Sequence, residues 1–215
     1  MSIEAVIFDL DGVIVSTDDY HYRAWKEISD KNGIYFDREI NERLRGVSRI
    51  ESLEIILEKA NRKYTEEEKV GFAEKKNYLY RELLEELTPE DILPGVMNVL
   101  KILKGKKIKV AIGSSSKNTE FILNKIGLKD YFDTVADGNQ IKNSKPDPEV
   151  FLLAANKINI DPVNCLVVED ADAGVEAALA GNMKVLAVGY ASNNKKANAG
   201  MEDLRQFNYE IINKI

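Results

Sequence analysis

Two pairs of acidic residues follow apolar runs of the sequence, where they could act together. Asp9 and Asp11 come directly after the run at residues 4–8, and Glu169 and Asp170 come directly after the run at residues 165–168. An Asp-Gly sequence is also a common turn, so the first pair alone does not establish a site. Carboxylate oxygens are the ligands that Mg²⁺ prefers, and the sequence has no His or Cys cluster for a softer ion. The two pairs therefore indicate a site for a hard divalent metal.

A serine and a lysine lie between these acidic pairs. Ser114 follows the apolar run at residues 108–113, and Lys145 lies in a loop directly before Pro146. Phosphoryl transfer needs a nucleophile, in-line geometry and positive charge around the phosphate oxygens. We expect Asp9 to be the nucleophile, because an ordinary aspartate pKa of about 3.9 leaves it ionised at neutral pH. Lys145 then supplies positive charge and Ser114 a hydrogen-bond donor.

The elements that must position these residues are predicted from alternating patterns. Buried parallel strands are expected at residues 4–8, 108–113, 165–168 and 185–188, and helices at residues 94–103, 118–126, 148–157 and 173–180. Alternating strands and helices are typical of a doubly wound α/β fold with a parallel sheet. Such open sheets bind ligands at the carboxyl ends of their strands. The four polar groups are therefore expected to converge on one crevice.

Between about residues 16 and 88 the pattern changes to helices without strands. Helices are predicted at residues 20–32, 37–44, 48–60 and 65–87. A capping box from Thr65 to Glu68 opens the last of them. We therefore predict an α/β catalytic core domain formed by residues 1–15 and 89–215, with residues 16–88 inserted as a helical cap domain.

Composition limits the classes of protein that this chain can represent. Its 215 residues are 44% hydrophobic and 31% charged, with a net charge of −6. The acidic balance argues against nucleic-acid or membrane binding, and no apolar run approaches the roughly 18 residues that cross a bilayer. A single cysteine, Cys165, cannot form an internal disulfide, and its apolar surroundings indicate a buried thiol. We expect a cytoplasmic monomer.

At this point the order of the motifs resembles a known superfamily. Asp9-Leu10-Asp11-Gly12-Val13, Ser114, Lys145 and Glu169-Asp170 are similar to the four ordered motifs of the haloacid dehalogenase superfamily, which has a Rossmann-like core. Residues 20–26, 46–49, 75–77 and 114–118 further resemble the β-phosphoglucomutases, and the similarity extends over nearly the whole chain. This resemblance implies interconversion of β-D-glucose 1-phosphate and glucose 6-phosphate through glucose 1,6-bisphosphate. Mg²⁺ is the implied cofactor, and the bisphosphate or another phosphoryl donor is the implied primer.

The resemblance also implies how the acidic residues divide the work. Asp9, the backbone carbonyl of Asp11, Asp170 and Glu169 are the expected metal ligands. Asp11 is the expected general acid and base, because a sugar hydroxyl with a pKa of about 15 is a poor nucleophile and a poor leaving group unless a proton moves. Ala171 stands where relatives often carry serine, which removes a hydrogen bond near the metal ligands.

A larger set of residues is assigned to substrate and phosphate binding. It comprises Thr17, His21, Trp25, Lys26, Gly46, Val47, Ser48, Arg49, Lys76, Ser114, Ser115, Ser116, Lys117, Asn118 and Lys145. Arg49, near a predicted helix start, is expected to bind a second phosphate. His21 is expected near the cap hinge, bonding to the surroundings of Asp11, and Thr17 in the linker. Three of these assignments have a structural alternative: Trp25 as part of the packing of the cap, Lys76 as a surface lysine, and Ser116 to Asn118 as a helix cap.

Two other functions remain open from the sequence. A sugar-phosphate phosphatase on the same fold would use the same four motifs, and only the cap distinguishes it from a mutase. A mutase must protect the phosphorylated aspartate from water while the bisphosphate reorients. A non-catalytic sugar-phosphate-binding protein is disfavoured, because each of the expected catalytic groups is present.

Overall fold

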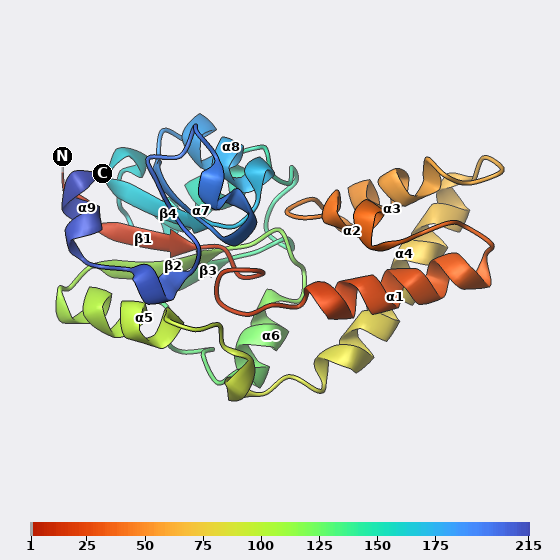
Figure 1. Cartoon of the computed structure of the whole chain (residues 1–215), viewed down its shortest axis with the longest axis horizontal. Helices are drawn as coiled ribbons and strands as arrows, with labels where there is room; N and C mark the ends of the chain where they lie inside the picture. Colours follow the sequence, from red (N-terminus) through yellow and green to blue (C-terminus); the bar gives the residue numbers. More distant parts are fainter. Residues whose placement is uncertain (1) are drawn as a thin grey trace.

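A six-stranded parallel sheet forms the centre of the larger lobe (Figure 1). A computed structural model describes residues 2–215 of the protein. The strand order is β3-β2-β1-β4-β5-β6, and each neighbouring pair is parallel. The strands are β1 (Ala5–Phe8), β2 (Lys109–Gly113), β3 (Thr134–Ala136), β4 (Cys165–Glu169), β5 (Lys184–Val188) and β6 (Ala199–Met201). The predicted doubly wound α/β fold is confirmed.

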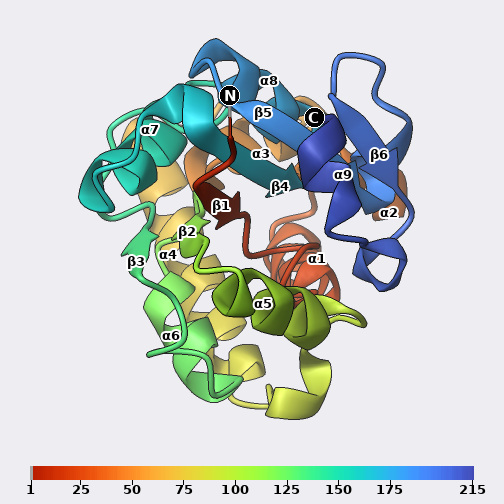
Figure 2. The ribbon, with the colours of Figure 1, turned by 90° about the vertical axis from the view of Figure 1, so that its left-hand side faces the viewer.

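Helices cover both faces of this sheet, which explains why its strands read as continuous apolar runs. Successive residues of a strand point to opposite faces, so Val6 and Phe8 join one apolar cluster, whereas Ala5 and Ile7 join another. Helix α5 (Val96–Gly105) packs into the first cluster, and α7 (Glu149–Lys157) and α8 (Asp172–Ala180) pack into the second. Figure 2 shows these helices on the two sides of the sheet.

Four helices between β1 and β2 form the smaller lobe, beside the carboxyl ends of the strands (Figure 1). They are α1 (Asp18–Lys31), α2 (Arg38–Glu42), α3 (Arg49–Leu57) and α4 (Glu66–Leu84). Their apolar centre includes the buried Trp25, Leu53 and Phe72. The capping box predicted at Thr65 is present. We keep the word cap for these helices, and the proposed division of the chain at residues 16 and 88 stays a prediction.

Several short elements were not predicted from the sequence. β3 and β6 have three residues each, which is too short for a periodic pattern to appear. Helix α6 (Thr119–Lys125) corresponds to the helix predicted at residues 118–126. No prediction was made for α9 (Glu210–Lys214) or for the four 3₁₀ segments at Pro89–Asp91, Pro162–Asn164, Gly189–Asn193 and Leu204–Gln206. Helices α2, α3 and α4 each end earlier than predicted. Within residues 2–215, no helix combines the length and apolar character needed to cross a membrane.

The thiol of Cys165 should be unreactive in the folded protein. Cys165 is fully buried on β4, and burial raises the pKa of the thiol to about 12. Because the thiolate is the reactive form, we expect iodoacetamide near pH 8 to label the native protein at least about a hundredfold more slowly than the urea-denatured protein. Mass spectrometry of timed samples checks this. Equal labelling rates would show that this face of the sheet opens.

Candidate active site

The chain turns sharply directly after β1. The N–H of Asp9 still donates to the carbonyl of Val168 at 2.9 Å, so Asp9 is anchored at the end of the sheet. Gly12 adopts a left-handed φ of 73°, and a Cβ there would overlap the Asp170 carboxylate. Glycine is therefore needed both for the backbone and for the space. This turn places the Asp9-Asp11 pair close to Asp170, which directly follows the neighbouring strand β4.

Three buried carboxylates meet at these strand ends. Asp9, Glu169 and Asp170 offer oxygen atoms that all lie within 4.8 Å of one another, and we call these residues the carboxylate cluster. Lys145 Nζ donates to Asp9 Oδ1 at 2.6 Å and to Glu169 Oε2 at 2.7 Å. Burial opposes a charged lysine, but the two carboxylates raise the pKa of Lys145 above its ordinary value. Lys145 is therefore a permanent buried cation.

One lysine does not balance the carboxylate cluster. Burial, then the Glu169 and Asp9 carboxylates, raises the pKa of Asp170 to about 9. Burial also raises the pKa of Asp9 to about 7, with Lys145 opposing the change. The expectation of an ordinary pKa for Asp9 omitted this burial. A second cation would restore the ionised carboxylates, and an all-oxygen donor set suits Mg²⁺, so the residues fit the expected metal.

Asp11 is held by the linker to the cap. The N–H of Thr17 donates to Asp11 Oδ1 at 2.9 Å, and the Thr17 hydroxyl donates to the same oxygen. His21 Nε2 lies 3.7 Å from Asp11 Oδ2. Burial raises the pKa of Asp11, but His21 and Thr17 outweigh it and lower the pKa below its ordinary value. In this arrangement Asp11 is an ionised carboxylate, suited to accept a proton.

A buried lysine continues this network into the cap. Lys76 Nζ lies 2.6 Å from His21 Nδ1 and 4.3 Å from the ring centroid of Tyr80. Burial, then the Arg49 charge, lowers the pKa of Lys76 well below its ordinary value. Burial and Lys76 together lower the pKa of His21. Lys76 is therefore not the surface lysine that its sequence context suggested, and an anion near it would restore its charge.

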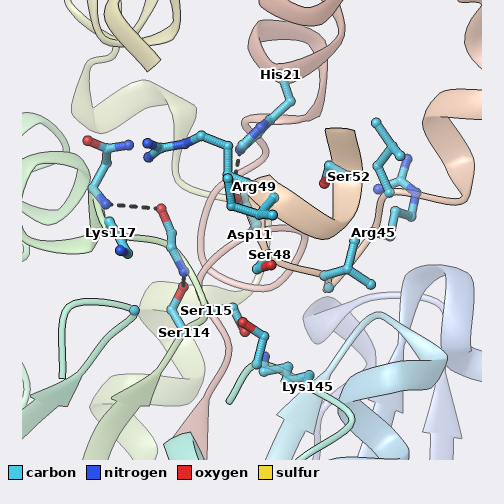
Figure 3. A pocket seen from close by; sticks show the side chains of 18 of the residues that line it. Asp11, His21, Arg45, Ser48, Arg49, Ser52, Ser114, Ser115, Lys117 and Lys145 are labelled. Atoms are coloured by element: carbon cyan, nitrogen blue, oxygen red, sulfur yellow. Dashed lines mark hydrogen bonds and ion pairs between the residues drawn. The ribbon is translucent and has the colours of Figure 1, made fainter. Parts of the chain in front are cut away.

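A cavity of about 510 Å³ separates the cap from the strand ends. Figure 3 shows His21 and Arg49 on its cap side and Ser114 and Lys145 on its core side. The sequence-predicted residues that line it are Asp9, Asp11, His21, Trp25, Gly46, Val47, Ser48, Arg49, Lys76, Ser114, Ser115, Ser116, Lys117, Asn118, Lys145 and Asp170. Residues far apart in the sequence thus meet at one site, although their roles in binding stay predictions.

Three predicted residues do not line the cavity. Thr17 donates a hydrogen bond to Asp11, and Glu169 accepts one from Lys145, but neither Thr17 nor Glu169 lines the cavity itself. The N–H groups of Asp170 and Ala171 both donate to Glu169 Oε1 at 3.0 Å, so this loop is held despite the missing serine. Lys26 lies elsewhere on α1 and pairs with Asp30 at 2.5 Å. Its predicted contact with substrate has no support from its position.

The cavity contains positive charge without acidic partners. Within residues 2–215, neither Arg49 nor Lys117 forms an ion pair, and Lys76 contacts only the neutral partners His21, Trp25 and Tyr80. Arg49 is the first residue of α3, whose start is fixed by a capping box from Ser48. These basic side chains, in the cavity that Asp9 and Asp170 also line, suit a substrate with more than one anionic group.

Sequence reasoning missed some residues that line the cavity. Tyr80 follows Lys76 by one helical turn, and Ser52 follows Ser48 in the same way, so helical spacing could have indicated both. Arg45 directly precedes the predicted segment at Gly46 and also lines the cavity. The other lining residues that the sequence did not indicate are Gly12, Asp18, Asn41, Leu44, Ile50, Val70, Ala73, Glu74, Gly138, Ile141, Lys142 and Ser144.

Comparisons with known proteins agree with this geometry. A family model described as haloacid dehalogenase-like hydrolase matches residues 3–182. The chain belongs to this family. As a haloacid dehalogenase-like protein, it is 45% identical over 189 residues to the β-phosphoglucomutase of Bacillus subtilis, covering 87% of this chain and 84% of the relative. The resemblance drawn from the sequence is confirmed, and the protein is an enzyme of this superfamily.

Two further relatives are a mutase and a phosphatase. The crystal structure of β-phosphoglucomutase from Clostridium difficile superposes with a TM-score of 0.93 at 47% identity, covering 99% of this chain and 96% of that structure. The phosphorylated carbohydrates phosphatase of Thermotoga maritima is 36% identical, over 91% of this chain and 89% of the relative. Mutases and phosphatases thus share this fold.

Removing the buried lysine should destabilise the protein in a pH-dependent way. Lys145→Met leaves Asp9 and Glu169 buried without a cation, so near pH 8 and without metal we expect a loss of about 3 to 5 kcal/mol in the free energy of unfolding. Near pH 5 the buried carboxylates of the variant should be protonated and uncharged. The loss in the free energy of unfolding should therefore be smaller at that pH. Urea unfolding measures both values.

The exposed Lys142, three residues earlier, provides the control for this measurement. Lys142→Met should change the free energy of unfolding by no more than about 0.5 kcal/mol. If Lys145→Met unfolds like the wild type at both pH values, the lysine does not neutralise the carboxylate cluster.

Proposed function

We propose that this protein is a magnesium-dependent β-phosphoglucomutase that interconverts β-D-glucose 1-phosphate and glucose 6-phosphate through glucose 1,6-bisphosphate. One observation carries the proposal: a single cavity is lined by Asp9 and Asp170 of the carboxylate cluster and by Arg49 of the cap, which forms no ion pair within residues 2–215. A sugar bisphosphate has one phosphate for each end. The similarity to the β-phosphoglucomutases of Bacillus subtilis and Clostridium difficile supports the same conclusion. A monomeric state and a cytoplasmic location stay predictions.

Asp9 performs the covalent step in this proposal. Lys145 holds Asp9 Oδ1, and the other carboxylate oxygen attacks phosphorus, so that an Asp9 O–P bond forms as the sugar O–P bond breaks. A magnesium ion held by Asp9, Asp170, the Asp11 carbonyl and Glu169 would screen the repulsion between carboxylate and phosphate. Ser114 donates a hydrogen bond to the transferring group.

Asp11 moves the proton between enzyme and sugar. When phosphorylated Asp9 transfers its phosphoryl group to the substrate 6-hydroxyl, Asp11 accepts the hydroxyl proton. After the bisphosphate reorients, the 1-phosphoryl group returns to Asp9, and Asp11 gives the proton to the departing 1-oxygen. The hydrogen bonds that Thr17 donates, together with His21 at 3.7 Å, hold Asp11 ionised and ready for the first transfer.

The cap holds the phosphate that is not reacting. Arg49, at the start of α3, and Lys117 lie at the side of the cavity away from Lys145 (Figure 3). Ser116 and Asn118, on either side of Lys117 in the sequence, also line the cavity and offer polar groups. Asn118 Nδ2 also donates to Asn77 Oδ1 of α4 at 3.0 Å, which joins this segment to the cap. Binding of the distal phosphate would therefore favour a closed cavity and exclude water.

A sugar-phosphate phosphatase is the second candidate, because the Thermotoga maritima phosphatase is similar over most of the chain. It would use the same Asp9 chemistry and release phosphate to water. A non-catalytic sugar-phosphate-binding protein has less support, since the expected nucleophile, acid, lysine and metal ligands are all present.

Product analysis distinguishes these candidates. With Mg²⁺, β-D-glucose 1-phosphate and a trace of glucose 1,6-bisphosphate, we expect ³¹P NMR to show glucose 6-phosphate as the main product. Excess EDTA should stop the reaction, because the donors are hard oxygens. Inorganic phosphate as the main product would favour the phosphatase, and full turnover in EDTA would exclude the proposed metal site.

Asp11→Asn should separate proton transfer from positioning. The variant keeps the backbone carbonyl but loses the titratable group, so transfer to or from the sugar should fall by about two to four orders of magnitude. Phosphorylation of Asp9 by acetyl phosphate should fall much less, because acetate leaves without a proton. Stopped-flow assays with both donors test this. Equal losses with both donors would assign Asp11 to organising the loop.

Arg49→Ala should impair the bisphosphate selectively. Losing a charge-assisted contact to the distal phosphate should reduce its kcat/KM by about one to two orders of magnitude. Acetyl phosphate has no distal phosphate, so its reaction should change little. Arg43→Ala is the control, because Arg43 is exposed and pairs with Glu58 outside the cavity. A similar loss with both donors would place Arg49 in the core site or in folding.

A further inference from the structure

Arg45 is a cap residue that the proposed reaction does not use. It lies in the segment between α2 and α3, and its side chain is only 16% exposed. Its guanidinium pairs with Asp18 through Nη2 at 2.9 Å and with Glu42 through Nε at 2.9 Å. Both carboxylates belong to the cap. They fix the orientation of the planar guanidinium group.

The same guanidinium reaches across to the core. It lies 3.8 Å from the ring centroid of Tyr190, and its Nη1 is 3.9 Å from Asp170 Oδ2. The neighbouring residue contributes to this contact, because a Cβ on Gly46 would come within 3.1 Å of the Ala171 Cβ. Cap and core therefore meet at the loop that carries a predicted metal ligand.

Arg45 is also placed between two clefts. A second cleft of about 310 Å³ lies on the other side of this contact, and its lining includes Tyr190, Glu202 and Asp203. Arg45 and Asp170 line both this cleft and the cavity. Among residues 2–215, Arg45 is the only ion-pair partner of Asp170, since Lys145 pairs with Asp9 and Glu169.

We infer that Arg45 is a positioning residue that couples the position of the cap to the charge of the metal site. The inference rests on the metal site of the proposed function. A divalent ion at Asp170 and the guanidinium attract the same carboxylate and repel each other. Metal binding therefore weakens this cap contact, and by reciprocity the contact weakens metal binding. The phosphates of the substrate add negative charge, which offsets this repulsion. The metal and the contact between Arg45 and Asp170 are then present together.

Metal affinity without substrate tests this coupling. Mn²⁺ is the probe, and its dissociation constant is measured by electron paramagnetic resonance for the wild type, Arg45→Met, Arg45→Lys and Arg43→Met. Methionine keeps the apolar stem and removes the charge, so we expect Arg45→Met to bind Mn²⁺ about threefold to tenfold more tightly. Arg45→Lys keeps the charge, and Arg43 lies outside both clefts. Both should bind like the wild type.

The position of the cap provides a second readout. Adding Mg²⁺ to the substrate-free wild type should increase the radius of gyration measured by small-angle X-ray scattering, whereas Arg45→Met should not respond. Tyr190→Ala removes the stacking partner and should shift Mn²⁺ affinity in the same direction by a smaller factor. Thermal unfolding confirms that each variant is folded.

The outcomes separate this inference from the proposed function. Normal Mn²⁺ binding by the wild type with equal or weaker binding by folded Arg45→Met would overturn the coupling and leave the proposed function intact. Failure of the wild type to bind Mn²⁺ would overturn both. An unchanged radius of gyration on adding Mg²⁺ to the wild type would also overturn the coupling.

Discussion

The burial of three carboxylates within 4.8 Å of one another is the constraint on which the site depends. Such a cluster is stable only with positive charge beside it, and Lys145 supplies one cation through two short hydrogen bonds. The surrounding chain is shaped to permit the cluster, since a Cβ at Gly12 or Gly174 would overlap one of its carboxylates. Its carboxylate oxygens are the donors that a hard divalent cation prefers.

The cap supplies the complementary charge. Arg49 and Lys76 line the cavity and have no acidic ion-pair partner within residues 2–215, and burial lowers the pKa of both. A phosphate group would relieve this cost, so binding of an anionic substrate and closure of the cap favour each other. Relatives with mutase and with phosphatase names are both similar to most of this chain. In the proposed function, the cap residues are expected to decide whether the phosphorylated aspartate meets a sugar or water.

The sequence predicted the features that depend on local patterns. Four continuous apolar runs indicated the central strands, and polar residues at their ends indicated the crevice. The strands β3 and β6 were too short to give a pattern. The raised pKa of Asp9 and the role inferred for Arg45 depend on contacts between distant segments, which spacing alone does not reveal. For Lys26, similarity to a motif suggested a substrate contact, whereas its side chain pairs with Asp30 and does not line the cavity, so its predicted role stays untested.

The central claim is that Asp9 carries the phosphoryl group. The most direct test incubates the protein with Mg²⁺ and glucose 1,6-bisphosphate, traps the acyl phosphate by borohydride reduction, and locates the reduced residue by peptide mass spectrometry. Aspartyl phosphates are reduced to homoserine, whereas phosphoserine is not. We predict one reduced residue, at position 9, and none in an Asp9→Asn variant. Trapping at another aspartate, or none under turnover conditions, would contradict the account.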